Sequence, residues 1–542
     1  MQMSLSKFLQ ENSRRKQKAG WSRKLPAVSL GLIFAIVLSL LYPADTFARQ
    51  GDSGYEGGIS TGETPNVTST TASSKAEYQY EEPCFLTGDP IMLSGKLTIT
   101  KKLKEDTRTK VQTLTTQYVY TLKNSDRAAT LTRNLTFVTA IIEKPNGQKT
   151  ESTQLTKATE TLVAGGVSYR IANITDYVLS KSILNDIKPA VNYYAGNLWS
   201  KKTYRTGTAT SDTVVVESTG KYYGYDQYWS SAEAQVINQT ISLNKPGKAP
   251  VIVGNIDLEI STTTKKDLKY YENAPDEISF SGGYVQTQSN ENVLKYTANL
   301  SERDKNKQPT GKIVKYNSSL SLPSFPAQTR LVSPSLSQIK GHPSEDSITL
   351  LFGLEAFDNA AAFDPEEYMS RAEFIDLLVK VAKAVPQDPV FTKARKPASN
   401  TKNITVTSPF VDIPVTHAYF DSINDAAQRG IASGGAGSKF RPDALVSVAE
   451  AVTMMMNSLG LTGLAPNPAP VTSFKDNDKI PSYARASIYV ADRIGLINED
   501  AKGYINPDGK ITKAEAADMM KVFIDYMSNG IRDDYMEKLI SY

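Results

Sequence analysis

The sequence of 542 residues contains a single cysteine, Cys84, and two histidines, His342 and His417. One thiol cannot form a disulfide within the chain, so the fold must depend on buried apolar surface and not on covalent cross-links. Because both histidines lie in the C-terminal part, the preceding region has no imidazole. This excludes Ser-His and Cys-His nucleophile pairs there and disfavours a His/Cys metal site, so we expect no metal and no cofactor.

The N-terminus is basic and then apolar. Residues 1–24 carry seven lysines and arginines and one glutamate, residues 25–42 carry no charge, and small residues follow up to Ala48. This order predicts a secretory signal peptide over 1–48, cut near Ala48. The alternative is an uncleaved membrane anchor, since the uncharged run is at the lower limit for crossing a bilayer. Without its basic signal the chain is near neutral, which disfavours nucleic acid as a partner.

Two regions of different composition follow the predicted signal peptide. Residues 49–78 are rich in Gly, Ser, Thr and Asn, which predicts a flexible leader. Residues 79–330 contain short alternating runs of Thr, Val, Ile and Tyr, such as Leu135 to Ile142, so we expect an all-β, antiparallel, sandwich-like region of one or two domains. After prolines near Pro323 and Pro334 the apolar spacing becomes helical, which predicts a separate helical domain and a multidomain chain.

The helical part contains an internal repeat. When Gly353, Gly430 and Gly495 are set in register, four further positions agree at fixed offsets in all three copies. These positions are a large apolar residue (Phe363, Phe440, Ile505), a proline (Pro365, Pro442, Pro507), a hydroxyl residue (Ser370, Ser447, Thr512) and a glutamate (Glu373, Glu450, Glu515). The agreement predicts three copies of one structural unit.

Each unit is expected to be a helix, a loop and a second helix. The glycine ends the first helix in a left-handed conformation, and Ser/Thr-x-Ala-Glu forms a capping box that starts the second. The predicted boundaries are 335–385 for the first, degenerate repeat, 386–409 for a loop, 410–460 and 474–527 for the other repeats, and 528–542 for a tail. The three apolar stripes must cover one another, so we expect one helical bundle.

One position is not explained by helix stability. The residue after the capping hydroxyl is Arg371 in the first copy and Lys513 in the third, although a cation at a helix start faces the positive end of the helix dipole. Either both are solvated surface cations, or the helix start binds an anion. In the second case the cationic side chain, the helix dipole and the backbone amides would all contribute to binding it.

The segments Met369-Ser370-Arg371-Ala372-Glu373 and Ile511-Thr512-Lys513-Ala514-Glu515 resemble the Ile-Thr-Arg-Ala-Glu motif of S-layer homology (SLH) domains. The openings Phe410-Val411-Asp412 and Phe474-Lys475-Asp476 and the stretch Arg429 to Gly434 are also similar to that family. The resemblance implies three repeats in a pseudo-threefold bundle that binds secondary cell-wall polysaccharide, often pyruvylated, in grooves where the motif cation meets the pyruvate carboxylate. The ligand-binding residues it implies are Ser370, Arg371, Asp412, Gly434, Ser447, Asp476, Thr512 and Lys513.

The departures from the family matter as well. The second copy has Val448 in place of the cation, and the first lacks a Phe-x-Asp opening, so we expect one or two working grooves. The resemblance implies a secreted Gram-positive protein of the cell wall or S-layer whose partner is the wall glycan. Self-assembly into a lattice and binding of other surface proteins stay open.

The β region carries two candidate features. Acids such as Asp226, Glu259, Asp276 and Glu277 could form a glycosidase pair, but none lies in a recognisable motif. An aromatic run, Lys221 to Trp229, with Tyr193, Tyr194 and Trp199, is either a carbohydrate platform or part of the β core and its edge. We therefore expect a non-enzymatic, wall-anchored surface or scaffold module, with a glycan-active enzyme or carbohydrate-binding adhesin as the alternative. The discriminating observation is whether two carboxylates converge in a cleft beside Trp199 or Trp229.

Overall fold

The computed structural model describes residues 54–535 except 62–67, 71–72, 107, 110, 145–147, 185–189, 207–211, 273–281, 305–307, 324–325, 386–389, 391–406, 436 and 469. The predicted signal peptide, most of the loop 386–409 and the end of the tail 528–542 lie outside the described residues. Among the helices that are described, none combines the length and apolar character needed to cross a membrane.

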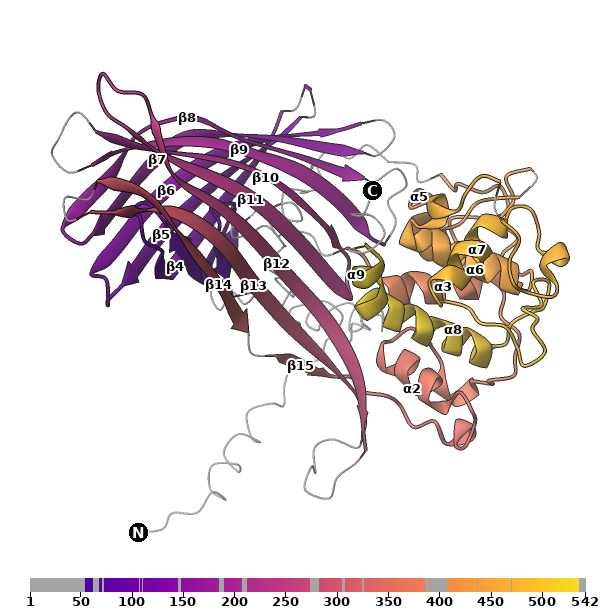
Figure 1. Cartoon of the computed structure of the whole chain (residues 1–542). Helices are drawn as coiled ribbons and strands as arrows, with labels where there is room; N and C mark the ends of the chain where they lie inside the picture. Colours follow the sequence, from indigo (N-terminus) through magenta and orange to yellow (C-terminus); the bar gives the residue numbers. More distant parts are fainter. Residues whose placement is uncertain are drawn as a thin grey trace, which may run out of the picture. The chain divides into compact units, whose positions relative to one another are not determined.

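The β region is one antiparallel sheet of 15 strands (Figure 1). From β3 to β14 each strand pairs with the next one along the chain, β1 and β2 pair with β3, and β15 pairs with β13. The strands are β1 Ile59–Ser60, β2 Thr68–Thr70, β3 Ser73–Cys84, β4 Ile91–Glu105, β5 Gln112–Asn124, β6 Ala129–Glu143, β7 Lys149–Ala164, β8 Val167–Leu184, β9 Asn192–Thr206, β10 Thr213–Asp226, β11 Ser230–Asn244, β12 Val251–Tyr271, β13 Gly283–Arg303, β14 Pro309–Pro323 and β15 Ala327–Arg330.

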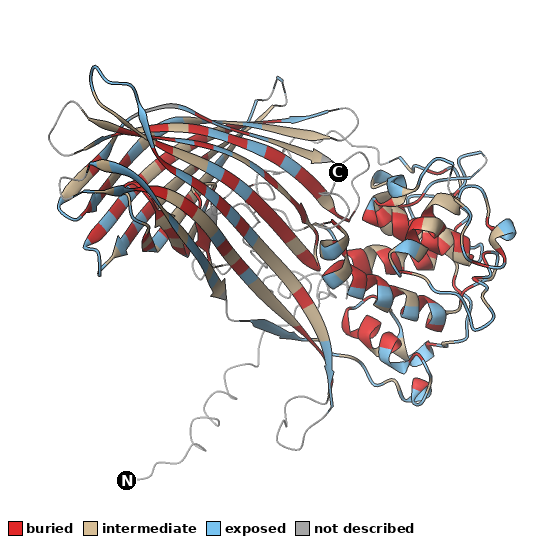
Figure 2. Cartoon of the chain, in the orientation of Figure 1, coloured by how far each residue is buried: buried red, intermediate tan, exposed pale blue. Residues whose placement is uncertain are grey.

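The all-β, antiparallel prediction is confirmed, but the predicted sandwich is wrong. Sequence neighbours are sheet neighbours throughout, so the described strands form a meander in one sheet and no second sheet packs on it. The alternation that predicted half-exposed strands is visible along each ribbon in Figure 2, where buried and exposed residues succeed one another. The sheet curls enough for its two ends to meet, because Phe85 contacts Tyr296 with ring centroids 5.2 Å apart and Tyr316 donates a hydrogen bond to Asp89 at 3.1 Å.

The predicted flexible leader, residues 49–78, is wrong for the residues that are described. Strand β3 begins at Ser73, and the segment Gly54–Ser60 lies along the inner face of the sheet, where Ile59 is fully buried. A Cβ atom on Gly58 would lie 2.4 Å from the Tyr80 hydroxyl, so only glycine fits there. Glycine-rich composition is typical of disordered segments, but here it lets the backbone of Gly58 pass close to the side chain of Tyr80.

The helical part contains three helix pairs. The first helices are α2 (Glu345–Gly353), α5 (Phe420–Gln428) and α7 (Arg485–Arg493), and the second helices are α3 (Arg371–Ala382), α6 (Val448–Leu459) and α8 (Lys513–Asp525). Each first helix packs against the second helix of another pair, α5 on α3, α7 on α6 and α2 on α8. This exchange closes the three pairs into a ring. At the interface of α5 with α3, the Ser422 hydroxyl donates a 2.5 Å hydrogen bond to Asp376.

The glycine register is wrong in the first pair. Gly430 and Gly495 adopt the predicted left-handed conformation with φ of 65° and 71°, but α2 ends at Gly353 and the left-handed residue is Glu355, with φ of 58°. The closing bond from Ala356 to the Leu351 carbonyl matches that from Ile431 to Ala426, so Glu355 is equivalent to Gly430. The loop that leads to Phe363 is consequently two residues shorter than the loop that leads to Phe440.

The aromatic run of the β region contacts the helical part. The Trp229 indole donates to the carbonyl of Val381 at the end of α3 (2.9 Å), and the Tyr193 hydroxyl donates to that of Leu459 at the end of α6 (3.0 Å). Ser230 donates at 2.6 Å to Met527, in the π-helical turn Tyr526–Gly530 that continues α8. Carbonyls at helix C-termini lack partners within the helix, so the sheet provides donors to the ends of α3 and α6, whereas at α8 it contacts the segment that continues the helix. The predicted separation into independent β and α domains is therefore wrong, since residues at one end of the sheet, such as Tyr225 and Trp229, belong to the buried core of the helical part, while the rest of the sheet has a second core.

Candidate functional site

Each second helix begins with a reciprocal capping box. In α3 the Ser370 hydroxyl accepts from the Glu373 amide at 3.2 Å, while the Glu373 carboxylate accepts from the Ser370 amide at 2.8 Å. The same two bonds join Ser447 with Glu450 in α6 (3.3 and 3.0 Å) and Thr512 with Glu515 in α8 (3.2 and 2.8 Å). The three helix starts are therefore equivalent in detail.

The next amides of each helix donate to the loop of a neighbouring pair. The amides of Arg371 and Ala372 donate to the carbonyls of Ala444 and Pro442 at 2.9 and 3.1 Å. The equivalent bonds run from Val448 and Ala449 to Gly509 and Pro507, and from Lys513 and Ala514 to Glu367 and Pro365. Three helix starts thus contact three loops in cyclic order. The expectation that these backbone amides bind an anion is wrong, because protein carbonyls already occupy them.

The cation at the first helix start lies between two helix pairs. Arg371 forms an ion pair with the capping glutamate Glu450 at 2.7 Å, donates from Nε to the Phe440 carbonyl at 3.0 Å, and covers the Phe440 ring with its guanidinium 5.0 Å from the centroid. Its side chain is 12% exposed and that of Glu450 is 28% exposed. The ring contact and the two bonds fix the guanidinium between the first and second pairs.

The cation at the third helix start also lies between an acid and an aromatic ring, but its acid is a loop residue and not a capping glutamate. Lys513 pairs with Glu367 at 2.5 Å, and its ammonium lies 5.8 Å from the Phe363 ring centroid. Phe363 and Phe440 occupy equivalent places in their loops. At the second helix start the side chain is the apolar, partly buried Val448. Two of the three equivalent positions therefore present a positive charge beside an aromatic ring.

Two tyrosines that sequence reasoning missed lie next to capping boxes. Burial and the charge of Glu450 raise the pKa of Tyr483, which also interacts with the Ser447 hydroxyl, although its side chain is 57% exposed. Burial and the charge of Glu373 similarly raise the pKa of Tyr419. The exposed phenol of Tyr483 could stack on a sugar ring. The sequence signal is a tyrosine just before α5 and α7, which has no counterpart before α2.

The remaining predicted ligand residues have partners inside the protein. Asp412 accepts the amides of Phe440 and Arg441 at 2.8 and 2.7 Å, and Asp476 accepts those of Ile505 and Asn506 at 3.2 and 2.9 Å. Burial alone would raise the pKa of Asp412, but these amide donors hold it below its usual value. A Cβ on Gly434 would lie 3.0 Å from the Phe410 ring. All three residues therefore shape the loops that receive the helix starts.

The predicted features of the β region do not assemble into a site. Asp226 lies at the end of β10, and Glu259 is exposed in the middle of β12, opposite Val236 of β11. Asp276 and Glu277 lie outside the described residues. Trp229 is fully buried against the helices, whereas Trp199 is 41% exposed on the outer face. Burial and the charge of Asp226 raise the pKa of Glu233, whose carboxylate accepts hydrogen bonds from Tyr194 and Gln235 at 2.8 Å each. The described residues contain no group of three His, Cys, Asp or Glu side chains suited to a metal ion.

Comparison with known proteins agrees with this geometry. Residues 409–452 and 473–517, which contain α5 with α6 and α7 with α8, match the S-layer homology domain. The match indicates attachment to the cell surface or cell wall and a cell-wall polymer as partner. It does not include the first helix pair.

Two curated proteins are similar to the chain. The exoglucanase XynX of Acetivibrio thermocellus is 20% identical over 390 residues, which cover 63% of this chain and 34% of that protein. The amylopullulanase of Thermoanaerobacterium thermosulfurigenes is 24% identical over 168 residues, which cover 31% of this chain and 8% of that protein. The chain thus spans about a third of the length of the first relative and less than a tenth of the second.

Proposed function

We propose that this protein is a non-enzymatic surface module that attaches to the cell wall by binding pyruvylated secondary wall polysaccharide in grooves between its helix pairs. The curled sheet is then the displayed part. The S-layer homology match supports the wall attachment. We also propose that residues 335–385 are a third repeat of this family, which the capping box at Ser370 and the closed ring support.

The observation that carries the proposal is the equivalence of Arg371 and Lys513. Each is held beside an aromatic ring and next to an acid of the neighbouring pair, Glu450 or Glu367. Glu367 is 54% exposed, so a ligand carboxylate can approach its lysine from solvent. A pyruvate carboxylate bound there would form a charge-assisted hydrogen bond of about 1.5–3 kcal/mol. The groove at Val448 lacks this charge, so we expect two working grooves.

The capping and loop residues hold these cations in place. Ser370, Ser447 and Thr512 fix the helix starts, while Asp412, Asp476 and Gly434 fix two of the loops on which the helix starts rest. Any contact of these residues with the glycan would come from the hydroxyls and not from the occupied amides.

The test is sedimentation of the mature protein with wall sacculi that keep their polysaccharide. The whole chain is required, because the helical part shares its core with the sheet. We expect the double variant Arg371→Ala, Lys513→Ala to bind at least about tenfold more weakly, since one lost charge-assisted bond already corresponds to that factor. Sacculi stripped of polysaccharide should retain neither protein.

A matched control removes two other cations. Lys340 and Lys502 are exposed in loops of the same helical part. The variant Lys340→Ala, Lys502→Ala changes the net charge equally and should bind as the wild type does. Equal weakening of both double variants would show that charge alone drives adsorption, and unchanged binding of the Arg371, Lys513 variant would remove these grooves as the binding site.

Glycan hydrolysis is the alternative that the names of the two relatives favour. Three acids other than those predicted, Glu56, Glu82 and Glu160, do converge inside the sheet, but all bind Arg133. Burial would raise the pKa of Glu160, but Arg133 and Lys202 lower it to about 2, whereas burial raises the pKa of Glu82 despite Arg133. Both carboxylates are bound by Arg133, so neither is available to a substrate as an acid or base. We therefore propose binding and not catalysis for the β region, and release of reducing ends from wall glycan by the purified protein would contradict this.

A further inference from the structure

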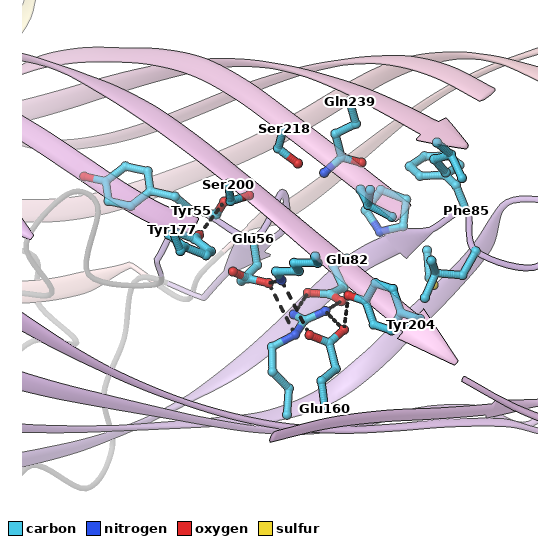
Figure 3. A pocket seen from close by; sticks show the side chains of 17 residues that line it. Tyr55, Glu56, Glu82, Phe85, Glu160, Tyr177, Ser200, Tyr204, Ser218 and Gln239 are labelled. Atoms are coloured by element: carbon cyan, nitrogen blue, oxygen red, sulfur yellow. Dashed lines mark hydrogen bonds and ion pairs between the residues drawn. The ribbon is translucent and has the colours of Figure 1, made fainter. Parts of the chain in front are cut away.

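A cavity lies on the inner face of the curled sheet, between β3, β6, β7, β8, β9, β10, β11 and the N-terminal segment Gly54–Ser60 (Figure 3). About 550 Å³ of space, which includes open solvent, lies among the lining residues. The lining is mixed, with charged, hydroxyl, aromatic and aliphatic side chains, as in many small-molecule sites.

One end of the cavity is a buried ionic network. Arg133 binds Glu82 with two hydrogen bonds of 2.8 and 2.9 Å, binds Glu160 at 3.0 Å, and lies 3.3 Å from Glu56. Lys202 pairs with Glu56 and, at 3.5 Å, with Glu160. Every one of these five side chains is less than 10% exposed. Three carboxylates face two cations, so the network has one negative charge in excess.

Glu56, which comes from the N-terminal segment, has one unsatisfied carboxylate oxygen. Its Oε2 contacts both cations and its carboxylate interacts with the Tyr177 phenol, but its buried Oε1 has no hydrogen-bond partner, and the side chain is only 3% exposed. A buried carboxylate oxygen without a donor costs free energy, so a donor in the cavity toward which Glu56 turns would stabilise it. A cationic donor would also restore electroneutrality.

A row of neutral polar groups lies across from the network. Ser200, Ser218 and Gln239 are direct cross-strand neighbours on β9, β10 and β11, and Figure 3 shows their side chains beside one another. No hydrogen bond joins these three side chains to protein within the described part of the chain. Beside this row the rings of Tyr55, Tyr177 and Phe85 also line the cavity. Hydroxyl and amide groups next to aromatic faces are the surroundings that a sugar ring requires.

We propose that this cavity binds an amino monosaccharide, with its ammonium group beside the carboxylate of Glu56 and its hydroxyl groups at Ser200, Ser218 and Gln239. An anion is disfavoured because the network already has excess negative charge. A neutral sugar would satisfy the polar row but leave the charge of Glu56 uncompensated. The site is separate from the proposed wall-binding grooves and uses none of their residues.

The test is titration calorimetry of the whole mature protein with glucosamine, glucose and N-acetylglucosamine. We expect glucosamine to bind at least about tenfold more tightly than the two uncharged sugars, because loss of one charge-assisted bond corresponds to that factor. Equal binding of glucose and glucosamine would overturn the role of the ammonium group, and absence of glucosamine binding would overturn the site.

The variant Glu56→Gln tests the carboxylate without stranding a cation. Arg133 keeps Glu82 and Glu160, and Lys202 keeps Glu160, so the variant should fold with an unchanged far-ultraviolet spectrum. It should lose glucosamine binding by at least about tenfold. The variant Ser218→Ala should weaken binding too, since it removes one group of the polar row.

The control Glu217→Gln removes a carboxylate from the outer face of β10, the strand that carries Ser218. Glu217 is exposed there and pairs with Lys201. This control should bind glucosamine as the wild type does. If Glu56→Gln also retains full affinity, the cavity is not the site. The Arg371, Lys513 double variant should keep glucosamine binding, so failure of the wall-binding proposal and failure of this one give different results.

Discussion

The contact between Trp229 and the end of α3 allows a quantitative test of how the sheet supports the helices. Trp229 is fully buried, and its indole nitrogen donates to the Val381 carbonyl at 2.9 Å. The substitution Trp229→Phe keeps an aromatic ring but removes the donor and leaves a buried carbonyl without its partner. That loss costs about 1–3 kcal/mol, and the smaller ring adds a packing cost of about 1 kcal/mol.

Urea unfolding followed by far-ultraviolet circular dichroism measures the effect. We expect the free energy of unfolding of the Trp229→Phe variant to fall by about 2–4 kcal/mol. Trp199→Phe is the matched control, because Trp199 belongs to the same sheet but is 41% exposed, and it should change stability by no more than about 0.5 kcal/mol. If the two variants lose equal stability, or if Trp229→Phe loses none, the sheet does not stabilise the helix ends in this way.

Two further predictions concern single residues. Glu355→Gly should raise the free energy of unfolding by about 1 kcal/mol, because Glu355 has a φ of 58° that glycine adopts without strain, and a destabilised variant in thermal melts would contradict the assigned backbone. Arg133 and Lys202 lower the pKa of Glu160 to about 2 against the effect of burial. The ionised Glu160 therefore contributes stability that is complete above its ordinary pKa near 4.5 and is lost as the pH falls toward 2. The free energy of unfolding measured between pH 5 and 2 should fall by up to about 3 kcal/mol, whereas a Glu160→Gln variant should show a smaller fall.

The helix starts were predictable because their chemistry is local. A hydroxyl residue and a glutamate three positions later specify both bonds of a capping box, so Ser370, Ser447 and Thr512 could be located from the sequence. The hydrogen-bond acceptors of the amides of Arg371 and Ala372 could not be predicted in this way, because they are carbonyls of a different helix pair, those of Ala444 and Pro442. The amides expected to bind an anion are thus occupied, and anion binding by the side chain of Arg371 stays a prediction.

In the β region the strands were predictable and their assembly was not. Period-two alternation indicates which residues of a strand face inward, but it contains no information on whether strands form one sheet or two. The same limit applies to Trp229 and Tyr193. A buried aromatic residue gives the same sequence pattern when it faces the core of the sheet as when it faces the end of a helix. Glu56 was missed because its glycine-rich surroundings are typical of disordered segments.

The sheet contacts α3 and α6 at their C-terminal ends and the segment that continues α8, so in each case the contact is opposite to the end that carries the capping box. A helix of 12 residues is about 18 Å long, so the proposed grooves and the sheet contacts are separated by that length of backbone. Tension between a tethered glycan and the displayed sheet would then run along three helices side by side. Mechanical load would be divided among three rows of backbone hydrogen bonds that must break together, an arrangement that resists pulling better than a single linker would.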